Sequence, residues 1–180
     1  VLGITSYGDI VKALNEAEAG HVFQEFKDIN ALPEDSGRRV ITTGGHFGYL
    51  KIAEGCDKHC TYCIIPSLRG KFRSVPEERL LKQAEYMASQ GARELILVAQ
   101  ETTGYGTDLY GKKTLHILLK KLCQIKGIRW IRVLYCYPEE IYDELIQVMK
   151  EEKKICHYLD LPIQHASDRI LKRMGRRTSK

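Results

Sequence analysis

Hydrophobic residues from position 49 onwards follow two alternating patterns. Short apolar or alternating runs predict β-strands, and longer stretches with apolar residues three and four positions apart predict amphipathic helices. The expected strands cover residues 49–53, 94–99, 129–135 and 157–161. The expected helices cover residues 76–90 (with Ser74 as a candidate N-cap), 114–124 and 138–150, and a fourth begins after Ser167. Strand and helix therefore alternate four times along the chain.

This alternation predicts an α/β fold with a parallel sheet and right-handed crossovers. It fits either an open doubly wound sheet or a (βα) barrel, although four units are too few to close a barrel. Active sites of parallel sheets lie at the carboxyl ends of the strands. We therefore expect Cys56, Gln100, Tyr135 and Gln164 to lie near the same edge of the sheet.

The beginning of the chain has a weaker pattern. Its apolar positions predict a helix over residues 9–19, and the composition of residues 31–39 is typical of a polar linker. Residues 40–43 are expected to form a short strand. The change in pattern divides the chain into a leading segment, residues 1–39, and a main domain, residues 40–180.

Composition narrows the class of protein. Hydrophobic residues make up 43% and charged residues 28% of the chain, as in ordinary globular proteins. No apolar run reaches the ~18 residues of a membrane helix, and the N-terminus lacks the features of a signal peptide. We therefore exclude a membrane protein and predict a cytoplasmic location.

Charge adds little to this picture. The net charge of +5 is weak evidence for an acidic partner. We interpret a basic run near the C-terminus as the solvated face of a helix, with nucleic-acid contact as the alternative. The run consists of Arg169, Lys172, Arg173, Arg176, Arg177 and Lys180.

Three cysteines stand close together, as Cys56, Cys60 and Cys63 in a C-x3-C-x2-C loop after the first expected strand. Three thiolates at this spacing can hold a 4Fe-4S cluster and leave one iron open for a substrate. Structural zinc prefers four ligands, and the only nearby fourth candidate, His59, lies badly placed inside the loop. The remaining cysteines lie in apolar segments and are expected to be buried, inert thiols: Cys123, Cys136 and Cys156.

The loop, with Tyr62 before its last cysteine, resembles the radical S-adenosylmethionine superfamily. Segments resembling the methylthiotransferases within it are KIAEGC at 51–56, IPSLRG at 65–70, Arg73-Ser74 and QETTGYG at 100–106. The stretches AQETTGYGTDLYG and LDLPIQHASDRILKRMGRRT are similar to the branch that modifies a small-subunit ribosomal protein. Asp160 and His165 favour this branch over the tRNA-modifying branches.

The resemblance implies an enzyme with a partial (βα) barrel that adds a methylthio group to the β-carbon of an aspartate in that ribosomal protein. Its cofactors would be S-adenosylmethionine and a 4Fe-4S cluster on Cys56, Cys60 and Cys63, reduced by flavodoxin or ferredoxin. No catalytic residue is assigned beyond these ligands. The residues expected at the cofactors are Tyr62, Gln100, Glu101, Gln164 and His165.

The chain also departs from the family. The family has an N-terminal domain with a second 4Fe-4S cluster, six βα units and a C-terminal β domain. No cysteine precedes Cys56, and residues 1–39 resemble only the tail of the N-terminal domain. We therefore expect a piece of the enzyme that cannot complete the reaction alone. Two alternatives stay open: a tRNA adenosine methylthiotransferase, and a non-catalytic module that binds metal through the same loop.

Overall fold

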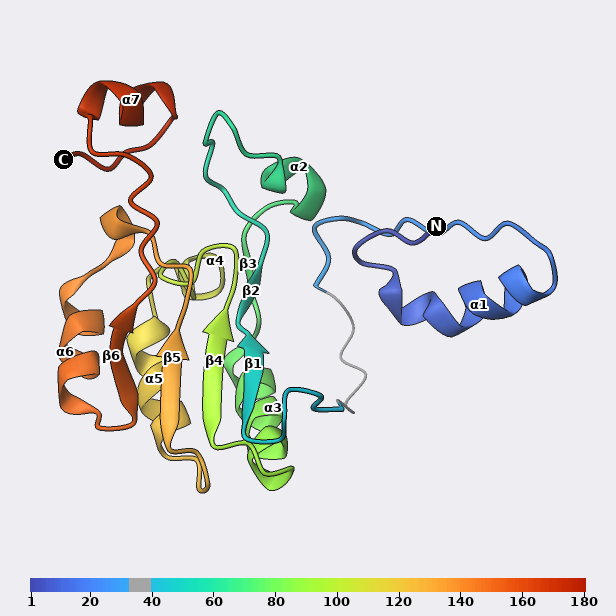
Figure 1. Cartoon of the computed structure of the whole chain (residues 1–180), viewed down its shortest axis with the longest axis horizontal. Helices are drawn as coiled ribbons and strands as arrows, with labels where there is room; N and C mark the ends of the chain where they lie inside the picture. Colours follow the sequence, from blue (N-terminus) through green and yellow to red (C-terminus); the bar gives the residue numbers. More distant parts are fainter. Residues whose placement is uncertain (33–39) are drawn as a thin grey trace.

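The fold is built on a parallel sheet, as Figure 1 shows for a computed structural model in which residues 1–32 and 40–180 are described. The sheet has four strands in the order β1-β4-β5-β6, and every neighbouring pair is parallel. The strands are β1 (Phe47–Lys51), β4 (Glu94–Val98), β5 (Trp130–Val133) and β6 (Ile155–Leu159). Their order follows the sequence, which confirms the predicted succession of βα units.

Three helices cover one face of the sheet: α3 (Glu77–Ser89), α5 (Leu115–Cys123) and α6 (Asp143–Glu151). Alternate strand residues point toward them, and Leu50, Leu97 and Ile131 are completely buried there. Leu118 of α5 is buried in the same core. This apolar layer is the core that the two periodicities predicted.

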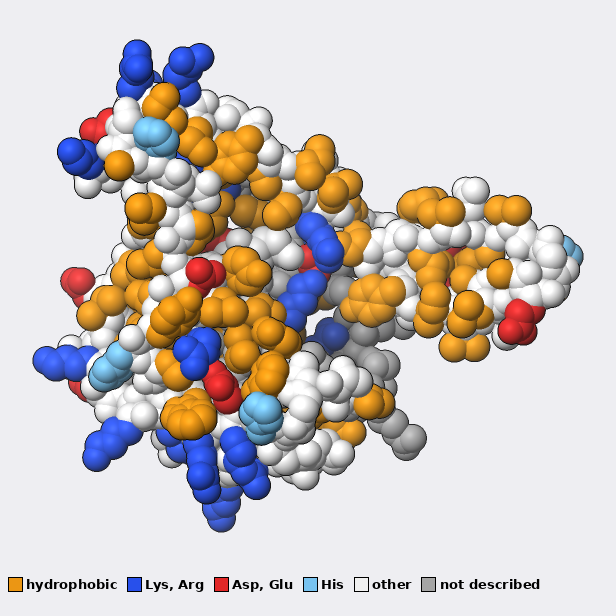
Figure 2. Space-filling model, in the orientation of Figure 1, with side chains coloured by type: hydrophobic (Ala, Val, Ile, Leu, Met, Phe, Trp, Pro, Cys, Tyr) orange, Lys and Arg blue, Asp and Glu red, His pale blue; other side chains and the backbone are white. Residues whose placement is uncertain are grey.

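The opposite face of the sheet is not covered by these helices. Tyr49, Ile96 and Arg132 occupy one row across β1, β4 and β5, on the side away from the core. The Arg132 guanidinium lies over the Tyr158 ring, 5.4 Å from its centroid, so β6 continues this face. Figure 2 shows hydrophobic side chains spread across it.

One predicted element is wrong, and a second begins later than predicted. Residues 40–43 form no strand. The helix expected from Pro138 is a 3-10 turn, Pro138–Glu140, and α6 begins only at Asp143. Ser74 does not cap α3, because its hydroxyl donates to Asp108 at 2.6 Å and the N-cap position is Pro76.

Shorter elements had no signal in the hydrophobic pattern. An antiparallel pair, β2 (Ala53–Glu54) and β3 (Arg73–Ser74), closes the cysteine loop at its base. Two short helices are α2 (Ile65–Arg69) and α4 (Thr107–Tyr110). Elements of two to five residues are too short to show a period. Helix α7 (Asp168–Arg173), by contrast, begins directly after Ser167, as predicted.

The leading segment contains a 3-10 turn, Tyr7–Asp9, and helix α1, Ile10–Glu18, close to the predicted range. Figure 1 shows it beside the sheet domain, near the turn that contains α2. The predicted linker lies mostly outside the described residues. Within residues 1–32 and 40–180, no helix has the length and apolar character needed to cross a membrane.

Candidate functional site

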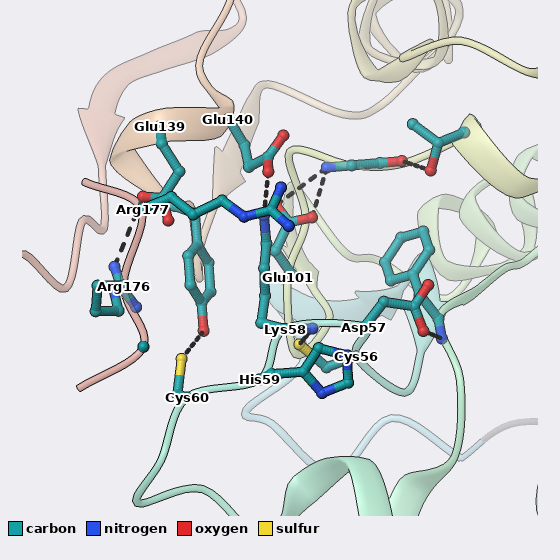
Figure 3. Close-up of a pocket in the computed structure, with 15 residues that line it drawn as sticks. Cys56, Asp57, Lys58, His59, Cys60, Glu101, Glu139, Glu140, Arg176 and Arg177 are labelled. Carbon is teal, nitrogen blue, oxygen red and sulfur yellow. Dashed lines mark hydrogen bonds and ion pairs between the residues drawn. The ribbon is translucent and has the colours of Figure 1, made fainter. Parts of the chain in front are cut away.

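A pocket of about 540 Å³ lies at the carboxyl edge of the sheet. The cysteine loop, the turn after β4, the turn after β5 and the residues after α7 together line it. The lining residues are Cys56, Asp57, Lys58, His59, Cys60, Phe72, Glu101, Gly104, Thr107, Tyr137, Glu139, Glu140, Gly175, Arg176 and Arg177. Figure 3 shows side chains from these segments converging on one space, as expected for a parallel sheet.

The cysteine loop is fixed at its start by a close approach of two backbones. Gly55 has a φ of +76°, and a Cβ there would lie 2.1 Å from the carbonyl oxygen of Lys71. Only glycine fits this position without displacing backbone. The next residue, Cys56, donates its amide to the carbonyl of Gly70 at 3.2 Å. The β2-β3 pair therefore sets where the first cysteine stands.

The three loop cysteines are free thiols. A turn joins the second and third, because the Cys63 amide donates to the Cys60 carbonyl at 3.0 Å. Burial is the main cause that raises the pKa of Cys56, and the charges of Glu101, Cys60 and Cys63 raise it further. The other two loop cysteines are thus close enough to act electrostatically on Cys56.

The cysteine geometry does not resemble a site for one metal ion. Among the described residues, no three His, Cys, Asp or Glu side chains are grouped closely enough to hold a single ion. In an iron–sulfur cluster each thiolate binds its own iron, so the sulfur atoms need not converge on one point. Three thiols on one loop beside a pocket fit this second arrangement.

Glu101 is a buried carboxylate on the wall of the pocket. Its two oxygens accept from the Gly104 amide at 3.0 and 2.9 Å, and the Thr103 hydroxyl also donates to it. Burial raises its pKa, while the hydrogen bonds and the nearby Lys58 oppose this effect. A tight turn therefore holds a carboxylate in place where a ligand in the pocket can meet it.

A second charged group lies near Glu101 in the pocket wall. The Lys58 ammonium pairs with Glu140, and Lys113 pairs with the same carboxylate at 2.8 Å. The two lysines hold the pKa of Glu140 below its usual value, against the effect of burial. This ion group connects the cysteine loop to the turn after β5, as Figure 3 shows for Lys58 and Glu140.

Several predicted site residues reach the pocket and others do not. Cys56, Cys60 and Glu101 line it, whereas Cys63 is half-buried outside its wall. Tyr62 is 54% exposed, and partial burial together with the neighbouring Cys60 raises its pKa. The assignments of these residues to a cofactor stay predictions.

The residues predicted to contact a cofactor after β4 and β6, apart from Glu101, do not line the pocket. The side-chain oxygen of Gln100 is buried without a hydrogen-bond partner among the described residues. Gln164 and His165 are exposed, and the His165 ring nitrogen Nδ1 accepts from the Ser167 amide at 2.9 Å. They follow β6 at the predicted edge, although neither lines the pocket.

Backbone strain marks this edge. Tyr135 and Gln164 are the non-glycine residues with positive φ among those described, at 59° and 63°. Each lies in the turn after a strand, β5 or β6. Such conformations persist where the surroundings enforce them, often at functional sites. Tyr135 is half-exposed and follows β5 at the expected edge of the sheet. Cys156 is likewise only half-buried, whereas Cys123 and Cys136 are buried as expected.

Four residues of the pocket wall were not predicted from the sequence: Lys58, Tyr137, Glu140 and Arg176. Tyr137 closely follows the predicted strand 129–135, which was the available signal, whereas Glu140 lay inside the expected helix 138–150. Arg176 was included in a basic run that we interpreted as a solvated helix face, and this is wrong for it because the residue is 7% exposed.

Comparison with known proteins extends these observations. Residues 50–180 match the family model of the Radical SAM superfamily. The chain is 63% identical over 99% of its length to "Ribosomal protein uS12 methylthiotransferase RimO" of Lachnoclostridium phytofermentans. It is 53% identical over its full length to the protein of the same name from Clostridium botulinum strain Eklund 17B. The chain spans 41% of the length of both relatives.

Solved structures agree at the level of fold. The radical S-adenosylmethionine methyltransferase TsrM from Kitasatospora setae, with a SAM analog bound, has a TM-score of 0.58 and 15% identity. It covers 75% of this chain, which corresponds to 26% of TsrM. The cobalamin-dependent radical enzyme OxsB has a TM-score of 0.57 and 17% identity, over 73% of this chain and 20% of OxsB.

Proposed function

The chain belongs to the radical SAM superfamily, and from this premise we propose that it is the core of a methylthiotransferase that modifies ribosomal protein uS12. One observation supports this most directly: the C-x3-C-x2-C loop stands at the carboxyl edge of a parallel sheet, with Cys56 and Cys60 on the wall of a pocket. The names of the relatives at 63% and 53% identity support the choice of substrate.

The residues present fit a 4Fe-4S cluster and S-adenosylmethionine. Cys56, Cys60 and Cys63 would hold the cluster, because thiolates are its usual ligands and all three thiols are free. When bound, the cluster leaves one iron for the amino and carboxylate groups of S-adenosylmethionine and supplies the electron that cleaves its carbon–sulfur bond. The buried, unpartnered oxygen of Gln100 is one acceptor available near this edge.

The chain itself would bind and orient the cofactor. Glu101 presents a carboxylate from a rigid turn, suited to an ammonium group. Phe72 forms part of the wall and excludes water from the pocket. Tyr62, Gln164 and His165 stay predicted contacts of the cofactor or the substrate.

The remaining predictions belong to the whole protein. We propose that residues 1–39 and 40–180 are separate parts of it, that a second 4Fe-4S cluster takes part in sulfur insertion, and that flavodoxin or ferredoxin is the reductant. A ribosomal substrate implies a cytoplasmic location. No observation favours tRNA as the substrate or a non-catalytic role.

Cluster binding tests the proposal first. Anaerobic reconstitution should give about four irons and four sulfides on this loop. Replacing Cys56, Cys60 and Cys63 together by alanine should abolish this cluster, whereas Cys123→Ala, a buried thiol far along the chain, should not. Full iron content in the triple variant would refute the ligand assignment.

Substrate modification tests the second part. The full-length protein that contains this chain, reduced with dithionite and given S-adenosylmethionine and either uS12 or tRNA, should add the mass of a methylthio group to uS12 only, whereas residues 1–180 alone should modify neither. Mass spectrometry of both substrates measures this. Modification of tRNA instead would replace the proposed substrate and leave the chemistry unchanged.

A further inference from the structure

The segment after α7 is attached to the cysteine loop by its backbone. The Thr61 amide donates to the Met174 carbonyl at 3.0 Å, and the Thr61 hydroxyl donates to the Arg173 carbonyl at 3.2 Å. A Cβ on Gly175 would lie 2.7 Å from the His59 carbonyl oxygen. The two segments are therefore in direct contact, although more than 100 residues separate them.

This contact buries a cation beside the loop. The Arg176 side chain is 1% exposed, and its closest carboxylate, Glu139, is 3.8 Å away. One terminal nitrogen donates to the Pro162 carbonyl at 3.2 Å, while Nε is buried without a partner among the described residues. Burying a guanidinium is costly unless negative charge compensates it. Arg176 thus has unused capacity for an anion.

The Tyr137 side chain contacts both Arg176 and the cysteine loop. The Arg176 guanidinium lies 4.2 Å from the ring centroid, and the Lys58 ammonium lies 5.2 Å from it. The Tyr137 hydroxyl is 3.8 Å from the sulfur of Cys60, within hydrogen-bond range for sulfur. Figure 3 shows Cys60 at the end of this arrangement, on the same side of the pocket as Arg176.

We propose that Tyr137 and Arg176 are positioning residues that raise the reduction potential of the cluster by stabilising negative charge on the Cys60 thiolate. The proposal rests on the proposed function, because it takes Cys60 as a cluster ligand. Tyr137 would donate its O–H to the sulfur, and Arg176 would place a positive charge beside the ring and the thiolate.

The direction of the effect follows from charge. Reduction adds an electron to a cluster whose thiolate ligands already carry negative charge. Hydrogen bonds to the sulfur atoms and nearby cations stabilise the more negative, reduced state. Removing either group should therefore make the potential more negative, so that a given reductant reduces a smaller fraction of the cluster.

The test measures midpoint potentials by EPR-monitored titration of the reconstituted protein. The signal that changes on addition of S-adenosylmethionine identifies the cluster on this loop. Tyr137→Phe and Arg176→Gln should each lower the equilibrium constant for reduction about threefold to tenfold, where tenfold corresponds to about 59 mV for one electron. Arg176→Lys, which keeps the charge, should show a smaller shift.

Two matched variants serve as controls. Tyr105→Phe removes another buried hydroxyl, whose partner is the Val75 carbonyl at 2.9 Å, outside the pocket wall. Arg173→Gln removes an equal charge from the same segment, at an exposed side chain. Both should leave the potential unchanged.

Each outcome decides between the two proposals. An unmodified protein that binds no cluster contradicts the proposed function. A loaded Tyr137→Phe protein with an unchanged potential overturns the present inference and leaves the proposed function standing. If Arg176→Gln fails to retain iron, Tyr137→Phe still decides, because it keeps the ring and removes one hydroxyl. Equal shifts in the control variants would also overturn the inference.

Discussion

The interior of the sheet and its carboxyl edge are built on opposite principles. In the interior, Leu97, Leu118 and Ile131 are completely buried among other apolar side chains. At the edge, the buried residues include Glu101 and Arg176, whose side chains ionise in water at neutral pH. Buried polar groups cost stability unless every one is satisfied. Apolar burial in the interior therefore stabilises the fold, and this stability offsets the cost of burying charged groups at the edge.

The cysteines show the same contrast. Burial raises the pKa of Cys123 and of Cys136 to about 11, so both thiols stay protonated and unreactive at neutral pH. Cys56 and Cys60 are also buried, but they line the pocket beside charged groups. Burial alone does not distinguish structural from functional cysteines. The groups that surround each sulfur atom distinguish them.

The largest change in the free energy of unfolding should come from opening a cavity in the interior of the sheet domain. Leu97→Ala removes a completely buried side chain from β4 and should lower the free energy of unfolding by about 2–5 kcal/mol. Leu68→Ala makes the same chemical change at a side chain that is 58% exposed and should cost less than about 1 kcal/mol. Urea unfolding of the cluster-free protein measures both. Equal losses would mean that the interior does not carry the stability.

The second prediction concerns the base of the cysteine loop. Gly55→Ala brings a Cβ to 2.1 Å from a backbone oxygen at positive φ, so the loop must move. We expect a loss of about 2–4 kcal/mol from the clash and the strain, and poor iron retention after reconstitution.

Gly20→Ala is the matched control for this change. Gly20 also has a positive φ, +80°, but no atom lies within 4 Å of the added Cβ. Only the conformational cost of about 1–2 kcal/mol should remain, with normal iron content. Normal cluster loading by Gly55→Ala would show that the loop tolerates displacement of its base.

The sequence predicted the sheet because each strand and covering helix is long enough to show its period. β4 reads as a nearly continuous apolar run, and the apolar stripe of α5 is buried in the core beside β5. The cysteine loop was predictable because its ligand types and spacing are local. Residues 138–142 were mispredicted because Pro138 suits the first turn of an α-helix as well as a 3-10 turn. The backbone becomes extended at Ile141 and Tyr142, so α6 begins only after them.

The rest of the pocket depends on contacts between distant segments. Lys58 meets Glu140 across 82 positions, and Cys60 meets Tyr137 across 77. No local pattern specifies such pairs. Arg176 carried the further difficulty that a charged residue in a basic run is usually solvated, whereas packing against the loop buries this one.

The third prediction uses pH to compare a buried carboxylate at the edge with its neutral isostere. The pKa of Glu101 is raised by burial, so the fold favours its protonated form. Protonated Glu101 therefore contributes fully to the free energy of unfolding below the pKa that Glu101 has in the unfolded chain. This contribution is lost as the pH rises through the higher pKa of Glu101 in the folded protein. Glu101→Gln should gain stability relative to the original protein as pH rises through this window.

Urea unfolding of both cluster-free proteins at several pH values between about 4 and 8 measures this difference. The two free energies of unfolding should diverge with pH, in favour of the glutamine variant. Parallel profiles would indicate that the hydrogen bonds from Gly104 and Thr103 offset the burial of the charge.

The smallest changes in the free energy of unfolding should come from breaking ion pairs. These changes should still differ between the outer helices and the carboxyl edge of the sheet. Lys120 and Glu151 pair at 3.8 Å on the outer helices, with side chains 54% and 48% exposed. Lys120→Ala should change the free energy of unfolding by less than about 0.5 kcal/mol, because water and salt screen such pairs. Lys58→Ala removes a partner of Glu140 whose side chain is 23% exposed.

The Lys58 variant should cost more, on the order of 1 kcal/mol, since a less solvated carboxylate depends more on its partners. Lys113 remains beside Glu140 at 2.8 Å and keeps the loss from being larger. Repeating both measurements in about 1 M salt, where the Debye length is about 3 Å, should remove the Lys120 effect and preserve most of the Lys58 effect. Equal salt sensitivity would mean that the carboxyl edge screens charge as the outer surface does, and that its buried groups owe their behaviour to hydrogen bonds alone.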